Sequence, residues 1–202
     1  MKAPRVWLCC GVVKAEMEEL KRRGSIDGTL LFLDSMLHMN PARLEKTLTA
    51  TLEQLSTPSA DLVLVYGDCS ARMLDLVRRF RVGRINCTNC AQFLVGRDRY
   101  RQLMNEEAFL ILPEWAARWE HIMKNELGLN QRVARDLMGE NRRILVYLDT
   151  GLTPVPEQEL AGFSTYSGLP WRVEAVPLDI MRQELLEALA RINPVEKAGD
   201  SP

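Results

Sequence analysis

The feature that most constrains the fold is the alternation of short apolar runs with helix-like segments along the chain. Strands alternating with helices, with almost continuous apolar residues in the strands, favour a mostly parallel sheet covered on both faces. We therefore predict an α/β fold with a mostly parallel sheet and helices on both faces. The expected strands are residues 6–10, 29–35, 60–67, 82–87, 109–113, 142–150 and 171–179.

The length of the chain sets its expected division into domains. A chain of 202 residues, 47% of them hydrophobic, fits one compact domain or two small lobes that share a sheet. The longest stretch without an expected strand is helical and ends near Gly139. We predict a main lobe over residues 1–139, a C-terminal lobe over residues 140–194 that shares or extends the sheet, and a tail over residues 195–202.

Composition argues against several classes of partner. The net charge is -1 and 26% of the residues are charged, so there is no basic excess of the kind that binds nucleic acid. No apolar run approaches the length of a membrane span, and the run near the start is too short for a secretory signal. We expect a cytoplasmic protein whose five cysteines are kept reduced.

All five cysteines fall near the carboxyl ends of expected strands, where open parallel sheets bind ligands. Cys9 and Cys10 end the first strand, and Cys69 follows the third. Cys87 and Cys90 form a CxxC motif after the fourth strand. A thiol at the start of a helix faces unpaired N–H groups and the positive end of the helix dipole. We therefore expect lowered thiol pKa values at Cys10, Cys69 and Cys90.

Such thiolates are ligands for soft metals. A CxxC pair joined by one cysteine from each of two other strand ends makes a tetrahedral thiolate set, suited to zinc or to an iron–sulfur cluster. The predicted metal ligands are Cys10, Cys69, Cys87 and Cys90. Possible additional site residues are His38, Asp34 and Asp68, although strand-end aspartates more often cap helices.

Other interpretations of the cysteines stay open. Buried cysteines often serve as small apolar side chains, and we expect this of Cys9, which should face away from Cys10. Cys87 and Cys90 could instead form a redox disulfide. A metal-free crevice that binds a small molecule is a third possibility. The sequence holds no GxGxxG after the first strand, no P-loop motif and no GxSxG motif.

Several other residues are expected to be structural. His121 lies within a helical stretch, and Trp115 and Trp119 share a helix face at a spacing typical of packing. A short basic stretch follows the third expected strand and is predicted to be a solvated helix end. Its residues are Arg78, Arg79, Arg81 and Arg84.

The residues at the strand ends also form a joint pattern. Its parts are Cys10-Gly11, Leu33-Asp34-Ser35 with Leu37-His38, Tyr66-Gly67-Asp68-Cys69, and Cys90 followed by Leu94-Val95-Gly96 and Tyr100. In these motifs the chain resembles an uncharacterised family of small prokaryotic α/β proteins, a domain of unknown function often found among genes for corrinoid-dependent methyltransferases. The resemblance covers about the first two-thirds of the chain.

The chain departs from the family pattern next to its CxxC motif. The family has His-Asp before its third cysteine, whereas this chain has Thr88-Asn89 with Cys87 just before them. If the family histidine is a ligand, Cys87 replaces it; if it is a base, the chemistry has changed. The resemblance implies a corrinoid protein or a methyltransferase as partner. The leading hypothesis is a metal-thiolate protein, accessory factor or enzyme, beside corrinoid or one-carbon methyl transfer.

Overall fold

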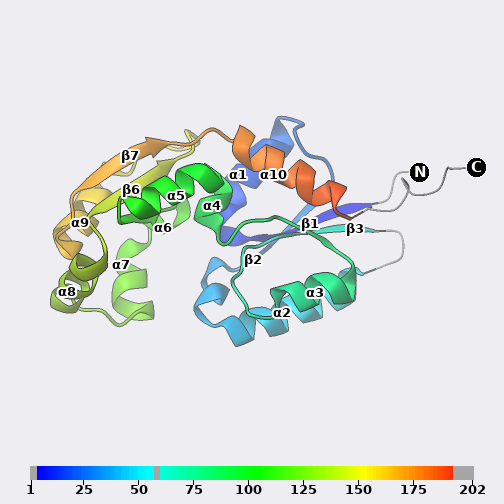
Figure 1. The fold of residues 1–202 in the computed structure, drawn as a ribbon, viewed down its shortest axis with the longest axis horizontal. Helices are drawn as coiled ribbons and strands as arrows, with labels where there is room; N and C mark the ends of the chain where they lie inside the picture. Colours follow the sequence, from blue (N-terminus) through cyan, green and yellow to red (C-terminus); the bar gives the residue numbers. More distant parts are fainter. Residues whose placement is uncertain (1–3, 57–59, 193–202) are drawn as a thin grey trace, which may run out of the picture. The chain divides into compact units, whose positions relative to one another are not determined.

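All of the expected strands are present in the computed structural model, which describes residues 4–56 and 60–192 (Figure 1). Helices separate the strands along the chain, and every strand pair is parallel, which confirms the predicted α/β class. The strands are β1 (Arg5–Cys10), β2 (Thr29–Leu33), β3 (Asp61–Val65), β4 (Gly83–Arg84), β5 (Ala108–Ile111), β6 (Ile144–Asp149) and β7 (Trp171–Ala175).

The strands form two sheets rather than one shared sheet. The first has the order β2-β1-β3-β4 and the second the order β5-β6-β7. The expectation that the C-terminal strands share or extend the first sheet is therefore wrong. The edge strand β4 spans only Gly83–Arg84 and offers few backbone groups to a further strand, whereas β6 pairs with β5 along the whole of Ala108–Ile111.

The chain divides into two compact units. The first unit contains residues 1–93 and 179–202, and the second contains residues 94–178. The expected boundary at residues 139–140 falls inside the second unit, because β5, which precedes it, pairs with β6, which follows it. The expected tail, residues 195–202, lies outside the described residues. Among residues 4–56 and 60–192, no helix is long and apolar enough to cross a membrane.

The first sheet carries helices on both faces, as predicted. The helices of this unit are α1 (Lys14–Arg22), α2 (Pro41–Leu55), α3 (Met73–Phe80) and α10 (Asp179–Ala190), with short 3-10 turns η1 (Gly11–Val13) and η2 (Ser35–Met39). Because β2 and β3 lie on opposite sides of β1, right-handed crossovers place α1 and α2 on opposite faces. Figure 1 shows α1 and α10 on one face and α2 and α3 on the other.

Helix α2 shows how local sequence builds this layer. It begins at Pro41, and the Asn40 side chain caps it by accepting a hydrogen bond from the Arg43 amide at 3.0 Å. Its fully buried leucines recur every fourth residue, at Leu44, Leu48 and Leu52. This spacing places them on one helix face, which is therefore the face that packs into the core.

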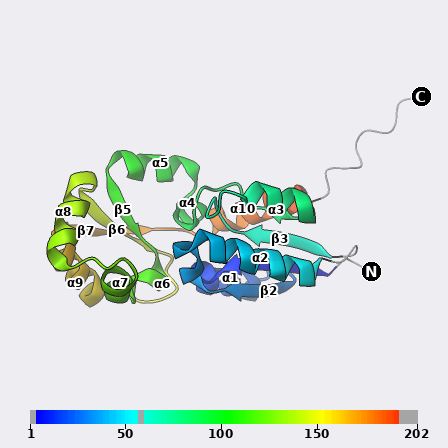
Figure 2. The ribbon, with the colours of Figure 1, turned by 90° about the horizontal axis from the view of Figure 1, so that it is seen from below.

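The second unit has its own layers and core. Its helices are α5 (Arg97–Asn105), α6 (Pro113–Ala116), α7 (Trp119–His121), α8 (Gln131–Asn141) and α9 (Glu157–Ser167), with a π-helical turn η3 (Ile122–Glu126). Helix α5 covers one face of the sheet, and α6, α7 and α9 lie on the other (Figure 2). The remaining helix, α4 (Cys90–Val95), contains the boundary between the units.

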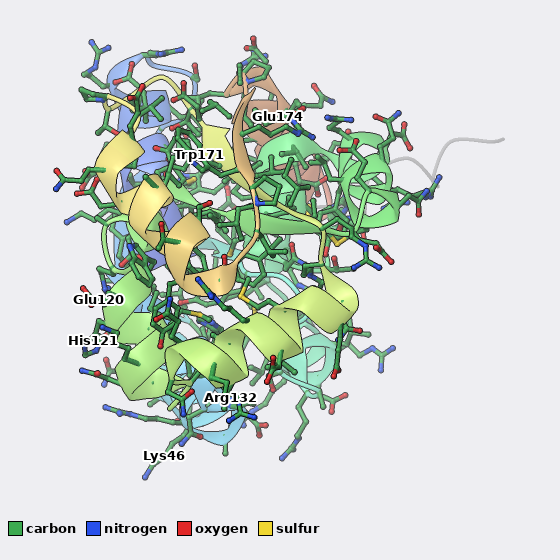
Figure 3. All side chains as sticks on the ribbon, turned by 90° about the vertical axis from the view of Figure 1, so that its left-hand side faces the viewer. Lys46, Glu120, His121, Arg132, Trp171 and Glu174 are labelled. Carbon is green, nitrogen blue, oxygen red and sulfur yellow. The ribbon has the colours of Figure 1, made fainter. Side chains whose placement is uncertain are left out.

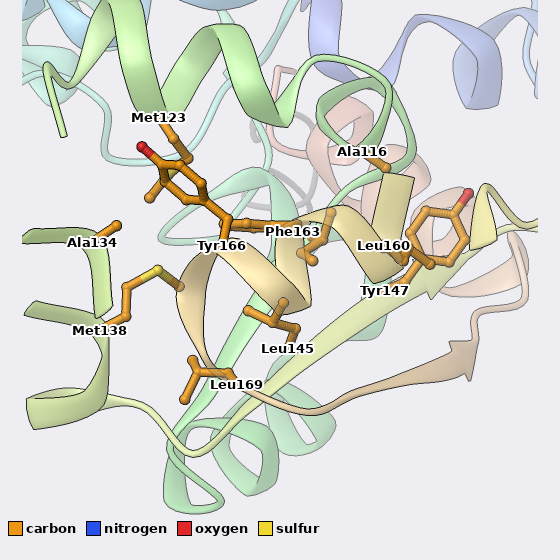
Figure 4. Close-up of a cluster of buried hydrophobic side chains, with 11 residues drawn as sticks. Ala116, Met123, Ala134, Met138, Leu145, Tyr147, Leu160, Phe163, Tyr166 and Leu169 are labelled. Atoms are coloured by element: carbon orange, nitrogen blue, oxygen red, sulfur yellow. The ribbon is translucent and has the colours of Figure 1, made fainter. Parts of the chain in front are cut away.

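Aromatic packing fills the core of the second unit. The Trp119 ring stacks on Phe163 at a centroid distance of 5.0 Å, and Tyr166 lies 5.3 Å from the Trp119 ring. Figure 4 shows Phe163 and Tyr166 beside Met123 and Leu145 in the same cluster. Trp119 is therefore a packing residue, as its position in the sequence predicts.

An ion-pair network joins β7 to α5 in this unit. Glu174 on β7 (Figure 3) accepts two hydrogen bonds from Arg99, at 2.6 and 2.9 Å, and a further one from Arg172. Arg172 also donates to Glu106 at 2.7 Å. The hydrogen bonds from Arg99 and then Arg172 favour the carboxylate and lower the pKa of Glu174 from 4.5 to about 2.

We predict that this network makes the second unit sensitive to acid. Above pH 4.5 the Glu174 carboxylate contributes its full stabilisation, which is lost as the pH falls toward about 2. Glu174→Gln should lower the free energy of unfolding by about 1 kcal/mol at pH 7, because solvent screening limits such pairs. The loss should shrink at pH 2. Urea titrations of both proteins measure this; Glu140→Gln, on an exposed position of α8, is the control. A loss that is equal at both pH values would contradict the prediction.

Candidate functional site

The cysteines gather at one edge of the first sheet. Cys10 is the last residue of β1, Cys69 lies in the turn after β3, and Cys90 is the first residue of α4. Because β1, β3 and β4 are parallel, their carboxyl ends meet at the same edge. All five cysteines belong to the first unit.

Four of the thiols interact with one another. The Cys90 thiol is hydrogen-bonded to Cys10, and its ionisation is opposed by the charges of Cys10, Cys69 and Cys87. Burial raises the pKa of the Tyr66 hydroxyl, and the charges of Cys10, Cys9, Cys90 and Cys69 raise it further, so Tyr66 lies beside the same group. We call Cys10, Cys69, Cys87 and Cys90 the thiol cluster.

Two thiols of this cluster, those of Cys69 and Cys90, are harder to ionise than ordinary cysteines. The hydrogen bond to Cys10 and then burial raise the pKa of Cys90 well above its usual value. Burial and the charge of Cys10 raise the pKa of Cys69, against smaller opposing effects of Gly67 and Arg84. The expected lowering is therefore wrong at both positions. One reason is that α4 has only six residues, so its dipole is weak against the cost of burying a charge.

The remaining cysteine is part of the core. Cys9 is 0% exposed and its thiol donates to the Trp7 carbonyl at 3.5 Å, while burial raises its pKa. Its neighbour Cys10 belongs to the thiol cluster, in keeping with the alternation of side chains along a strand. All five cysteines lie within the described residues, and none of them forms a disulfide.

Two glycines let the strand-end loops approach closely. A Cβ atom on Gly11 would lie 2.9 Å from the Leu33 carbonyl oxygen and 3.3 Å from the Ser35 amide nitrogen. A Cβ atom on Gly67 would lie 2.5 Å from the Thr88 carbonyl oxygen. Real side chains do not tolerate contacts this short with backbone, so each loop packs against the next only because a glycine stands there.

Residues Thr88 and Asn89, which stand where the family has His-Asp, shape the start of α4. The Asn89 side chain accepts from the Gln92 amide at 2.9 Å, and the Gln92 side chain accepts from the Thr88 amide at 2.6 Å. These reciprocal bonds resemble a capping box and fix Cys90 in the first turn. The Thr88 carbonyl also accepts from the Asp68 amide at 2.8 Å, which ties this segment to the loop that carries Cys69.

The additional candidates have other contacts. Asp34 caps η2 by accepting from the Met36 amide at 2.8 Å, and Asp68 is paired with Arg84. His38 contacts the Ser35 carbonyl through Nδ1. A carbonyl can only accept, so Nδ1 carries the proton and Nε2 bears the lone pair of the neutral ring. This tautomer is typical of metal-binding histidines.

The second histidine lies away from the cysteines in sequence and in structural unit. His121 on α7 (Figure 3) has a side chain that is 52% exposed and that contacts Glu126 at 3.1 Å. It belongs to the second unit, whereas the thiol cluster belongs to the first. We therefore leave it out of the site, as the sequence predicted.

Sequence reasoning missed one residue of the site. Arg84 was expected at a solvated helix end, but α3 ends at Phe80 and Arg81 takes a left-handed conformation with φ of 52°. Arg84 therefore lies in β4 with a side chain that is only 10% exposed. The available signal was the expected strand over residues 82–87, which contains Arg84 and is incompatible with a helix end there.

The donor set of the cluster suits a soft metal, since it consists of thiols from three strand ends. In the described part of the chain, however, no group of three or more His, Cys, Asp or Glu side chains is arranged to hold a metal ion. Binding would therefore require the thiols to move closer together. The cluster itself lies at one sheet edge, where Cys10 and Cys87 are buried and Cys69 and Cys90 are half-buried.

Comparisons with known proteins place the chain in a family. The model described as "Protein of unknown function (DUF1638)" matches residues 32–185, most of the chain. No curated protein and no solved structure matches it. The matched range includes Cys69, Cys87 and Cys90 and begins after Cys10. This agrees with the expected uncharacterised family, and the match says nothing about corrinoid proteins.

We predict that the closeness of the two loops depends on Gly67. Gly67→Ala would place a methyl group against the Thr88–Asn89 backbone and should cost about 1 to 3 kcal/mol of stability. It should also speed hydrogen exchange at the Asp68 amide. Gly139→Ala in α8 is the control, because no neighbouring atom lies within 4 Å. That variant should gain up to about 1 kcal/mol. Equal stabilities of the two variants by urea titration would contradict this account.

Proposed function

We propose that this chain, which belongs to the DUF1638 family of proteins of unknown function, binds a metal centre through its thiol cluster. The proposed centre is a zinc ion or an iron–sulfur cluster. Cys10, Cys69 and Cys90 supply the central ligands, and Cys87 is the fourth. One observation carries the proposal: the parallel pairing of β1, β3 and β4 brings cysteines from three strand ends to one sheet edge. The hydrogen bond between Cys90 and Cys10 supports their closeness.

Electrostatics supports a cation at this site. In the metal-free protein, the hydrogen bond to Cys10, burial and the neighbouring thiols oppose the ionisation of Cys90, and burial and the charge of Cys10 oppose that of Cys69. A metal ion reverses this balance, because its positive charge stabilises each thiolate and deprotonates the coordinating thiols. Thiolate ligands select soft or borderline metals such as zinc and iron over magnesium or calcium.

Metal binding would replace a hydrogen bond of the metal-free cluster with metal–sulfur bonds. The hydrogen bond between Cys90 and Cys10 would be replaced by bonds from both sulfurs to the metal. His38 is the reserve ligand, because imidazole nitrogen is a common ligand of zinc and iron and His38 follows β2 in the same unit. A site with three thiolates and one open position would suit catalysis, whereas four thiolates would suit a structural centre.

The family resemblance supports a setting for this centre. We propose that the protein acts beside corrinoid-dependent or one-carbon methyl transfer, with a corrinoid protein or a methyltransferase as its partner. A thiolate-bound zinc lowers the pKa of a further thiol bound to it, which is the chemistry that a methyl acceptor requires. The protein would be either the enzyme or an accessory factor that holds the acceptor.

A dithiol redox protein is the competing function. The hydrogen bond between Cys90 and Cys10 favours this pair over the Cys87–Cys90 pair of the CxxC motif. The raised pKa of Cys90 counts against such a role, because the thiolate is the reactive species in disulfide exchange. A metal-free protein with a reversible disulfide would replace the metal proposal with this one.

The first prediction concerns metal content. Protein purified without oxygen should hold about one zinc, or iron with sulfide, per chain. Cys90→Ala should lose that metal, and Cys9→Ala, which removes a neighbouring core thiol, should retain it. Elemental analysis and absorption spectra measure both, and urea titrations show that the variants are folded. Equal metal loss from the two variants would mean that the wrong cysteines have been assigned.

The second prediction concerns protons. Because the pKa values of Cys69 and Cys90 are raised, both thiols carry protons at pH 7 in the metal-free protein. Zinc binding should release about one proton per coordinated thiol, and the apparent affinity should rise with pH. An indicator dye in weakly buffered solution measures the release. Zinc uptake without proton release would exclude thiol coordination.

A further inference from the structure

Arg84 is a charged side chain placed inside the first unit beside the thiol cluster. Its side chain is only 10% exposed. Its Nε donates to the Tyr66 carbonyl at 3.1 Å, and its Nη2 donates to the Cys87 carbonyl at 3.4 Å and to the Asp68 carboxylate. One guanidinium therefore contacts both loops that carry cysteines after β3 and β4.

These contacts depend on the fork shape of the guanidinium. Arg84 lies in β4 in register with Leu64 of β3, and its backbone carbonyl accepts from Arg191 at 3.0 Å. From this fixed point its separate N–H groups reach residues 66–68 and residue 87 at once. A lysine has one compact charged group and can supply the charge without the same set of directed bonds.

We propose that Arg84 is the positioning residue of the thiol cluster, which holds the Cys69 loop against the Cys87–Cys90 segment and balances the negative charge of a thiolate-bound centre. Asp68 then acts by orienting Arg84 and is not a metal ligand. The charge-balancing part rests on the proposed metal function. The positioning part rests on the contacts of Arg84 alone.

The physical reason is the charge of such a centre. Three or four thiolates around a divalent ion leave a net negative charge, which is costly in a buried site. Arg84 offers a positive charge at that place, and it already acts on Cys69 in the metal-free protein. Groups that orient metal ligands typically change metal affinity by about 10- to 100-fold when they are replaced.

Cobalt titrations test the proposal. Co²⁺ substitutes for zinc, and its sulfur-to-metal absorption reports how many thiolates bind. Arg84→Met should weaken Co²⁺ binding by about 10- to 100-fold and reduce this absorption per metal. Arg84→Lys should recover part of the affinity, because it keeps the charge. Arg79→Met removes an exposed arginine paired with Glu53 from the same unit and should change neither. Equal affinity of Arg84→Met and wild type would overturn the proposal.

A double-mutant cycle tests the role of Asp68. If Asp68 acts through Arg84, Asp68→Asn should weaken Co²⁺ binding in the wild-type background and add little in the Arg84→Met background. If Asp68 is a metal ligand, the two losses should multiply. Multiplied losses would therefore overturn the assignment of Asp68 as a partner of Arg84.

Hydrogen exchange separates this inference from the proposed function. If the wild-type protein takes up neither Co²⁺ nor a cluster from iron and sulfide, the proposed function fails. The metal-free protein still decides on Arg84: Arg84→Met and, to a smaller degree, Arg84→Lys should speed exchange at the Asp68 amide, which donates to the Thr88 carbonyl at 2.8 Å. Unchanged exchange in Arg84→Met, with Arg79→Met as the reference, would overturn the positioning role.

Discussion

The parallel pairing of β1, β3 and β4 is the constraint on which the site depends. Parallel strands end at the same edge of a sheet. Backbone pairing therefore brings residues that are far apart in the sequence to this edge, whatever their side chains are. Cys10, Cys69 and Cys90 follow these three strands. Shifting one strand by a residue would turn its side chains to the opposite face and remove its thiol from the cluster.

Two glycines then allow the loops after these strands to pack closely against one another. Gly11 lets the β1 end approach the β2 end, and Gly67 lets the β3 end approach the segment that follows β4. Backbone and arginine hydrogen bonds then fasten the last two loops together. The loops that carry Cys69 and Cys90 are therefore held together by close backbone packing and by hydrogen bonds to main-chain groups.

This arrangement disfavours the ionisation of thiols at the sheet edge. The hydrogen bond to Cys10 and then burial raise the pKa of Cys90, and burial and the charge of Cys10 raise the pKa of Cys69, so these two thiols keep their protons in the metal-free protein. A neutral thiol packs much like a small apolar side chain, so the stability of the fold alone does not require cysteines at these positions. A bound cation would stabilise the thiolates that burial disfavours, which is the physical basis of the proposed metal function.

The strands, the parallel class, the edge that bears the cysteines and the core position of Cys9 could all be predicted from the sequence, because strand periodicity and chain order depend on local patterns. Other features depend on the folded arrangement. The short β4 and the pairing of β5 with β6 divide the strands into two sheets. The hydrogen bond to Cys10 and burial raise the pKa of Cys90, which a helix start alone would lower. The side chain of Arg84 turned inward rather than to solvent. Each of these depends on which groups surround a residue in space, and a sequence pattern does not carry that information.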